Sequence, residues 1–133
     1  MLRYLLDTNL CIRVLRDRPT TLRDRFNTEA DSLCILAVVL MELLHSAEKS
    51  ARPAHNRREV ERFAARLGVL PFDAGAAGHT ADMSASLERR GPTIGGYELL
   101  IAGHARSRRL TVVTGNLGEF NRVEALRCED WPA

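Results

Sequence analysis

The 133-residue sequence predicts a single α/β domain, in which a short, mostly parallel β-sheet is flanked by helices in a three-layer α/β/α arrangement. Two observations predict this fold class. Short apolar runs of strand length alternate along the chain with longer segments whose apolar residues recur at helical spacing. Strands that alternate with helices form βαβ units, and a parallel sheet built from such units carries helices on both faces.

The first half of the chain contains two predicted strands and three predicted helices. Residues 3–6 form a short buried strand, and a helix follows over residues 8–16. A second helix is predicted over residues 19–26, because the proline at its start suits the first helical turn. The apolar stretch SLCILA, residues 32–37, is the second strand. The segment VVLMELLHSAEKS, residues 38–50, is the helix that follows it.

The second half alternates in the same way. The segment HNRREVERFAARLG, residues 55–68, has apolar residues at helical spacing and ends in a glycine, which commonly stops a helix. The stretch VLPF, residues 69–72, is a third strand. Helices are predicted over residues 74–90 and 97–108, with GPTIGG as the loop between them, and residues 111–113 form the fourth strand.

Composition and cysteine usage predict a cytoplasmic protein without membrane contact. No apolar run approaches the roughly 20 residues that a membrane span needs, and the start MLRYLLDTN reaches an acidic residue too early for a signal peptide. The cysteines Cys11, Cys34 and Cys128 are odd in number and widely spaced, which favours buried reduced thiols. No zinc site is expected, because the histidines show no ligand spacing with these cysteines.

The basic residues are almost all arginines, since Lys49 is the only lysine in a chain of net charge +2. Guanidinium groups suit the recognition of phosphates. A genome that favours arginine codons explains the same composition, so arginine content alone does not identify a nucleic-acid-binding protein.

Three carboxylates stand out, and each has two interpretations. Asp7 follows the first strand in LLDTN, where it can cap the next helix or begin a ligand site at the end of the strand. Glu42 is the only charge in VVLMELL, so it is either paired with an arginine or part of a site, because burying a lone carboxylate costs several kcal/mol. Glu98 opens an apolar helix face, where the helix N-terminus alone also favours an anion.

The last predicted strand ends in TVVTGNLGEF, so Thr114, Asn116 and Glu119 follow it as Asp7 follows the first strand. A turn is the alternative, given the two glycines nearby. Carboxylates that gather at one sheet edge repel one another and keep their charge best around a cation. Oxygen ligands select Mg²⁺ or Mn²⁺ over zinc, and such an ion indicates phosphoryl chemistry.

The motifs LLDTNLCIRVL, LMELLHSAEKS, LLIAGHARSRRL and TGNLGEF, with the closing EDW, resemble those of the PIN-domain ribonucleases and most closely those of the VapC toxins of bacterial toxin–antitoxin pairs. The resemblance covers the whole chain and implies one PIN domain over residues 1–133 with a PIN-like fold. It implies that Asp7, Glu42 and Glu98 bind Mg²⁺ or Mn²⁺. Asn116 takes the place of a fourth acid that some members carry, with Glu119 close behind, which completes the expected catalytic set.

The resemblance also implies an activity and partners. The expected activity is metal-dependent endoribonuclease cleavage of structured RNA to inhibit translation, with the anticodon loop of initiator tRNA as the expected target. The expected partners are a second copy of the chain in a homodimer and a VapB-like antitoxin. Operator DNA would be contacted only through that antitoxin.

Departures from the family pattern support an alternative function. Glu98 stands where the family usually has Asp, Gly96 where it usually has Pro, and Asn116 where some members have an acid. Ala37 and Val39 occupy a segment that usually carries Ser or Thr. The alternative is therefore a weakly active or inactive PIN-domain binding module, which acts through its antitoxin and through repression of its own operon. Glu98 is the residue that separates the two hypotheses.

Overall fold

The structure, a computed structural model, describes residues 1–16 and 20–131. Within them, a five-stranded sheet has the strand order β3-β2-β1-β4-β5, and every pair of neighbouring strands is parallel. This confirms the predicted α/β class and the parallel sheet. The strands are β1 (Tyr4–Leu6), β2 (Leu33–Leu36), β3 (Gly68–Leu70), β4 (Thr111–Val113) and β5 (Cys128–Glu129).

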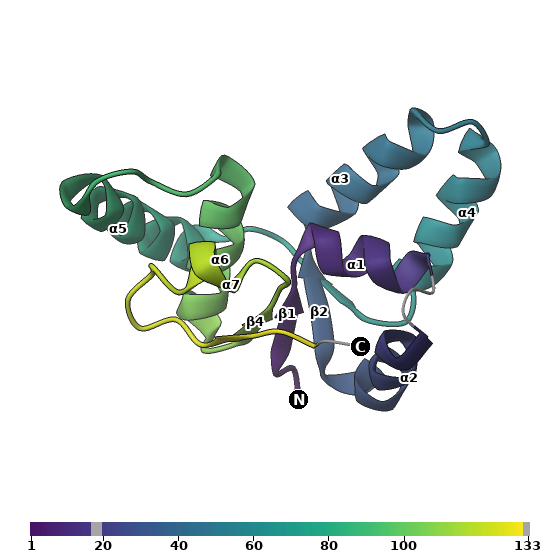
Figure 1. Cartoon of the computed structure of the whole chain (residues 1–133), viewed down its shortest axis with the longest axis horizontal. Coiled ribbons are helices and arrows are strands. Elements are labelled where there is room, and N and C mark those ends of the chain that lie inside the picture. Colours follow the sequence, from purple (N-terminus) through teal and green to yellow (C-terminus); the bar gives the residue numbers. More distant parts are fainter. Residues whose placement is uncertain (17–19, 132–133) are drawn as a thin grey trace.

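Helices flank the sheet on both sides (Figure 1). Helices α5 and α6 lie on one side, while α1 and its neighbours α2, α3 and α4 lie on the other. No helix in the described part of the chain is long and apolar enough to cross a bilayer. The helices are α1 (Thr8–Leu15), α2 (Thr20–Glu29), the short 3-10 helix η1 (Ala30–Ser32), α3 (Ala37–Glu48), α4 (Pro53–Ala64), α5 (Ala74–Arg90), α6 (Gly96–Arg108) and α7 (Leu117–Phe120).

The core is built around the two central strands β1 and β2, in which every residue is buried. Helices on both sides remove solvent from both faces of these strands, so they are continuously apolar rather than alternating. The chain closes this core near its end with Trp131, which is 1% exposed. The Trp131 ring packs against Tyr4 of β1 in an edge-on arrangement, with 5.2 Å between ring centroids.

The predicted helix over residues 55–68 has different bounds in the structure. Helix α4 begins at Pro53, because proline occupies its first turn, and it ends at Ala64. Gly68 was interpreted as the helix stop, which is wrong: it is the first residue of β3 and pairs with Cys34. Leu67 fits the helical spacing but packs against the core from the turn that follows α4, which is why the pattern extended too far.

Other differences concern small elements and one thiol. Helix α2 runs to Glu29, three residues beyond the predicted end, and the predicted start at Pro19 lies outside the described residues. Helix α7 and strand β5 were not predicted. Cys11 and Cys34 are buried thiols as expected, whereas Cys128 is only half-buried, because the edge strand β5 leaves it closer to solvent.

Candidate active site

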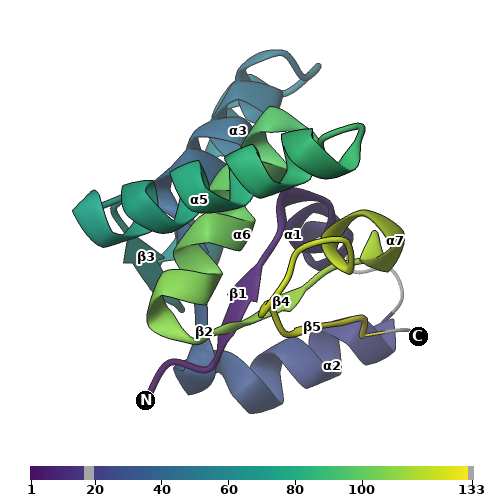
Figure 2. The same ribbon diagram turned by 90° about the vertical axis from the view of Figure 1, so that its left-hand side faces the viewer.

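The five residues of the predicted site come to one edge of the sheet, where the carboxyl ends of the central strands meet the helices that follow them. Asp7 directly follows β1, and Glu42 lies in α3, the helix after β2. Glu98 is in the first turn of α6, and Asn116 and Glu119 begin α7 after β4. Figure 2 shows β1 and β4 running side by side toward α1 and α7. We call these five residues the acidic edge.

Asp7 is held from two sides. It is 5% exposed, and its Oδ1 accepts a hydrogen bond of 2.9 Å from the Leu10 backbone N–H, so the capping interpretation is confirmed. Its Oδ2 accepts a bond of 2.5 Å from the hydroxyl of Thr114, which is itself buried after β4. The same carboxylate therefore caps α1 and joins β1 to β4, so capping does not exclude a place in a site.

The charge environment of Asp7 is that of a crowded acidic cluster. Burial raises the pKa of Asp7, and the negative charge of Glu98 raises it further. Hydrogen bonds from Thr114 and Leu10 and the positive charge of Arg13 oppose that rise in the pKa. Arg13 lies within the motif LLDTNLCIRVL but was not expected at this edge, because its position depends on how α1 packs beside the loop at Gly115.

Glu42 is connected to Asp7 through Thr8. The Thr8 hydroxyl donates a 2.6 Å hydrogen bond to Glu42 Oε1, and Thr8 directly follows Asp7 in the chain. No arginine pairs with Glu42 among the described residues, so the ion-pair interpretation finds no support there. Burial raises the pKa of the Cys11 thiol well above its usual range. The negative charges of Asp7 and Glu42 raise this pKa further, so both carboxylates lie near the same turn of α1.

Glu98 and Glu119 flank the same glycine. Glu119 Oε1 accepts a 2.6 Å bond from the Gly95 N–H, and its Oε2 accepts a 2.5 Å bond from the Asn116 amide. A Cβ atom built on Gly95 would collide with the Glu98 carboxylate and lie 3.6 Å from Glu119 Oε1. Gly95 therefore leaves room for the Glu98 carboxylate, a role that the sequence alone did not indicate.

A continuous polar path connects most of the acidic edge. The Asn116 N–H donates a 2.9 Å bond to the Thr114 hydroxyl, which links the Asn116–Glu119 pair to Asp7. Glu42 joins at the other end through Thr8. The carboxylates of Asp7, Glu42 and Glu119, from three separate segments, are therefore connected.

The donor set suits a hard divalent cation, since every side-chain ligand in it offers oxygen. In the described residues, however, no three His, Cys, Asp or Glu side chains are arranged as a ready cation site. The carboxylates of Asp7, Glu42 and Glu119 instead accept hydrogen bonds from neighbouring groups. Metal ligation by Asp7, Glu42 and Glu98 therefore stays a prediction.

Two of the departures from the family pattern are visible at this edge. Helix α3 begins at Ala37 after Leu36, with no side-chain hydrogen bond at its N-terminus. Helix α6 begins at Gly96 after Gly95, again without a side-chain cap. Neither N-cap residue therefore caps its own helix with a side chain, unlike Asp7 at α1, although the Glu119 carboxylate accepts a hydrogen bond from the N–H of Gly95 at the start of α6.

The acidic edge is separate from the groove between α1, α3 and α4. That groove has a volume of about 360 Å³, and none of the five residues of the acidic edge lines it. The candidate site is therefore distinct from this groove, and its side chains range from the buried Asp7 to the exposed Asn116. The groove is lined by Ile12, Leu15, Arg16, Leu43, Ser46, Ala47, Ser50, His55, Asn56, Glu59 and Val60.

Comparisons with known proteins agree along the whole chain. The family model of the PIN domain matches residues 4–126. A protein of Shigella flexneri named tRNA(fMet)-specific endonuclease VapC is 48% identical over 131 residues, which cover 98% of this chain and 99% of that protein. Ribonuclease VapC2 of Haemophilus influenzae is 42% identical, with the same coverage of both chains.

Solved structures show the same likeness. A chain in the DNA-bound VapBC structure from Salmonella typhimurium has a TM-score of 0.95 at 48% identity, covering 99% of this chain and 100% of that one. A chain in the structure of VapBC2 from Rickettsia felis, bound to a fragment of promoter DNA, has a TM-score of 0.92 at 31% identity. That match covers 98% of this chain and 100% of the other.

Proposed function

Because this chain belongs to the PIN-domain family and, within it, to the VapC ribonucleases, we propose that it is the endoribonuclease toxin of a toxin–antitoxin pair. We further propose that a divalent cation is required and that the acidic edge is the active site. The observation that carries the proposal is the polar network that joins Asp7, Thr114, Asn116 and Glu119 where β1 and β4 end.

In this proposal, Asp7, Glu42 and Glu98 would hold Mg²⁺ or Mn²⁺. When bound, the ion would activate a water molecule and stabilise the charge that develops on the scissile phosphate. The chain orients two of these carboxylates in advance, since Thr114 and Leu10 hold Asp7 and Thr8 holds Glu42.

The outer part of the acidic edge would position the attacking water and the RNA. Asn116 is exposed, and its amide is held by Glu119, so it can offer its remaining hydrogen-bonding groups to a water or a phosphate oxygen. The substrate we propose is structured RNA, and specifically tRNA, because relatives at 48% identity are named for tRNA(fMet). A single-stranded loop exposes a phosphate that could approach the exposed Asn116, which favours the anticodon loop.

A cleavage assay on purified tRNA tests the proposal. The chain should cut the tRNA in Mg²⁺, and a chelator should stop the reaction. Glu42→Gln removes the charge but keeps the size and the contact to Thr8, so it should lose cleavage while it remains folded. Cleavage that persists with the chelator, or in Glu42→Gln at the original rate, would refute the assignment of this site.

The alternative of a binding module that does not cleave is favoured by one specific observation. The described residues contain no ready arrangement of three metal-binding side chains, and Glu98 stands at one of the predicted ligand positions. In that case the protein would act through its antitoxin and its operator. Intact folding and antitoxin binding, without cleavage in Mg²⁺ or Mn²⁺, would select this alternative.

We propose a VapB-like antitoxin and a second copy of the chain as partners, because the similar structures are VapBC complexes, two of them bound to DNA. An arginine of the antitoxin would suit the acidic edge, since a guanidinium forms paired hydrogen bonds with carboxylates. Expression of the toxin alone should arrest growth, and co-expression of the neighbouring antitoxin should restore it. Growth without arrest would count against the toxin–antitoxin assignment.

A further inference from the structure

A second polar surface lies at the opposite end of the sheet, where β4 and β5 begin. A hollow of about 560 Å³ is formed there by the residues that directly precede these strands and by the end of α6. We call it the arginine hollow. It is lined by Arg106, Arg109, Leu110, Ala125, Leu126 and Arg127, without a carboxylate among them.

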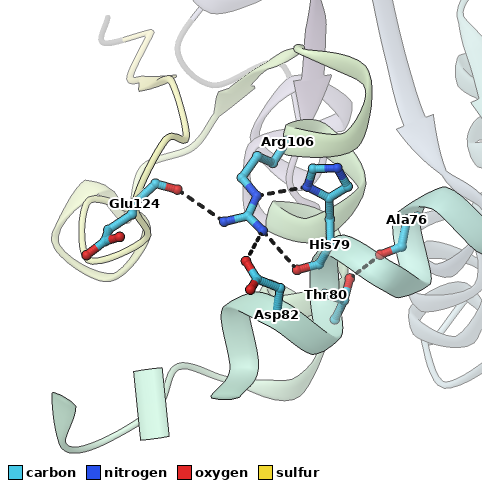
Figure 3. Close-up of polar contacts among 6 residues, drawn as sticks. All are labelled: Ala76, His79, Thr80, Asp82, Arg106 and Glu124. Carbon is cyan, nitrogen blue, oxygen red and sulfur yellow. Dashed lines mark hydrogen bonds and ion pairs between the residues drawn. The ribbon is translucent and has the colours of Figure 1, made fainter. Parts of the chain in front are cut away.

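Arg106 lines the arginine hollow, and its guanidinium is already bonded to other parts of the fold (Figure 3). Its Nε donates a 3.0 Å bond to His79 Nδ1, and its Nη2 forms a 2.6 Å ion pair with Asp82, both on α5. Its Nη1 donates to the backbone carbonyl of Glu124 at 3.4 Å, while the Glu124 carboxylate points away from it. Arg106 therefore fastens the segment before β5 to α5 and α6, and its charge is balanced by Asp82.

Arg109 and Arg127 are different, because they are exposed and their charges are not balanced. Neither forms an ion pair with a carboxylate among the described residues. Arg127 Nη2 donates a 2.7 Å bond to the backbone carbonyl of Arg109, which orients its guanidinium but does not neutralise it. Two exposed arginines that line the same hollow suit a phosphate, which accepts paired hydrogen bonds.

The backbone provides an independent observation at the same place. Arg109 has a φ of 56°, a left-handed conformation that ends α6, and Ala125 has a φ of 60°. Glycine adopts this conformation without steric cost and is the usual residue after a helix end of this kind. Both non-glycine residues with positive φ in the described chain line the arginine hollow. An arginine at position 109 therefore costs stability relative to glycine.

We propose that the arginine hollow binds a backbone phosphate of the RNA, away from the bond that is cut; this inference rests on the proposed function. The acidic edge repels a polyanion, so affinity must come from positive charge elsewhere. Arg109 and Thr114 lie on either side of β4 and are five positions apart in the chain, so they are separated by at most about 17 Å. A folded RNA whose loop reaches the acidic edge can also contact the arginine hollow.

Two further arginines lie between the two surfaces. Arg122 Nη1 donates to the carbonyl of Thr93, two residues before Gly95, and Arg90 Nη2 donates to the carbonyl of Arg122. Both bonds are to backbone oxygens, and neither arginine forms an ion pair with a carboxylate among the described residues. Arg90 and Arg122 thus add guanidinium groups between the acidic edge and the arginine hollow, while residues 116–127 themselves carry two arginines and two glutamates.

The test is binding of purified tRNA to the full chain in EDTA, where no divalent cation supports cleavage, measured across a series of salt concentrations. Arg109→Gly combined with Arg127→Gln should weaken binding about tenfold and reduce the slope of log affinity against log salt by about 1.5. Arg58→Gln removes an exposed arginine of α4 and should change neither quantity.

A second control separates binding from folding. Arg109→Gly and Ala125→Gly both relieve a positive φ, so both should raise the midpoint of thermal unfolding by roughly 2–5 °C. Only Arg109→Gly should weaken tRNA binding. A variant that is more stable but binds less tightly cannot owe its lost affinity to misfolding.

Two outcomes overturn the inference. One is that the double variant binds tRNA as the unchanged protein does, or loses no more affinity than Arg58→Gln. The other is that it keeps its tRNA affinity but loses antitoxin binding, which would make the arginine hollow a protein interface. Failure of the proposed function is seen separately, as tRNA that binds through the arginine hollow but is never cut when Mg²⁺ is added.

Discussion

The acidic edge and the arginine hollow lie at opposite ends of the same parallel sheet, and they are built in opposite ways. Asp7 at the acidic edge is buried, and both of its carboxylate oxygens accept hydrogen bonds from fixed donors. Arg127 at the arginine hollow is exposed and is held by one bond to a backbone carbonyl. Bond cleavage depends on fixed orientation, whereas attraction of a polyanion depends mainly on charge.

Both regions reduce stability, but through different physics. At the acidic edge the cost is electrostatic, because burial and the charge of Glu98 raise the pKa of Asp7. At the arginine hollow the cost is conformational, because Arg109 adopts a left-handed backbone that favours glycine. Function and stability are therefore separable by mutation at both places, and the variants below test that difference.

The largest expected effect is at Asp7. Asp7→Asn keeps a residue that caps helices well but removes the charge, so cleavage of tRNA should fall about a thousandfold, which corresponds to ~4 kcal/mol of lost transition-state stabilisation. The thermal midpoint should rise, because a buried charge is removed. Single-turnover kinetics and thermal unfolding measure the two changes. A variant that loses stability together with activity would contradict the electrostatic account.

The next effect separates affinity from chemistry. The double variant of Arg109 and Arg127 should raise KM for tRNA about tenfold and leave kcat nearly unchanged, because it removes binding that is equal in the ground and transition states. Asp7→Asn should instead reduce kcat. Steady-state kinetics with both variants test the contrast, and a reduced kcat in the arginine variant would show that the arginine hollow also takes part in the chemistry.

A smaller effect is expected when Glu98 is replaced by Asp. If its longer side chain only displaces the cation, Glu98→Asp should raise the cleavage rate several-fold, up to about tenfold. The gain should be larger in Mg²⁺ than in Mn²⁺, because Mg²⁺ demands near-ideal octahedral geometry. Glu98→Gln should abolish cleavage. Equal rates for all three forms would show that Glu98 is only an anion at a helix start.

The smallest effect is on the pH dependence of stability. The pKa of Asp7 is raised above its usual 3.8, so the folded state holds that proton more tightly than the unfolded state does. The free energy of unfolding therefore falls as pH rises from about 3.8 through the raised pKa, and it is not regained at neutral pH. The advantage of Asp7→Asn in thermal midpoint should be larger at pH 7 than at pH 4. An advantage that does not change with pH would leave the raised pKa unsupported.

The bounds of some elements were predicted correctly, and the reason is physical. Helix α5 and strand β4 have the predicted bounds, because clear turn signals mark their ends. Helix α7 and strand β5 were missed, since four and two residues are too few to show a period. Gly68 misled the prediction, because a glycine after an apolar helix face can also begin a strand.

The site was predicted in part for a similar reason. Asp7 and Asn116 could be placed together because parallel strands end at one edge of a sheet. The hydrogen bond from Thr8 to Glu42 spans 34 positions in the sequence, and no local pattern indicates it. Arg109 and Arg127 are 18 positions apart and meet only because β5 pairs with β4, a strand that the sequence did not reveal.

A substitution at Gly95 should inactivate the toxin without unfolding it. A methyl group there would collide with the Glu98 carboxylate, the end of a flexible side chain that can move aside while the backbone stays in place. In cells that carry the toxin gene without its antitoxin, survivors should therefore include Gly95→Ala. Such survivors should still produce folded protein at normal levels, whereas those with changes in β1 should not.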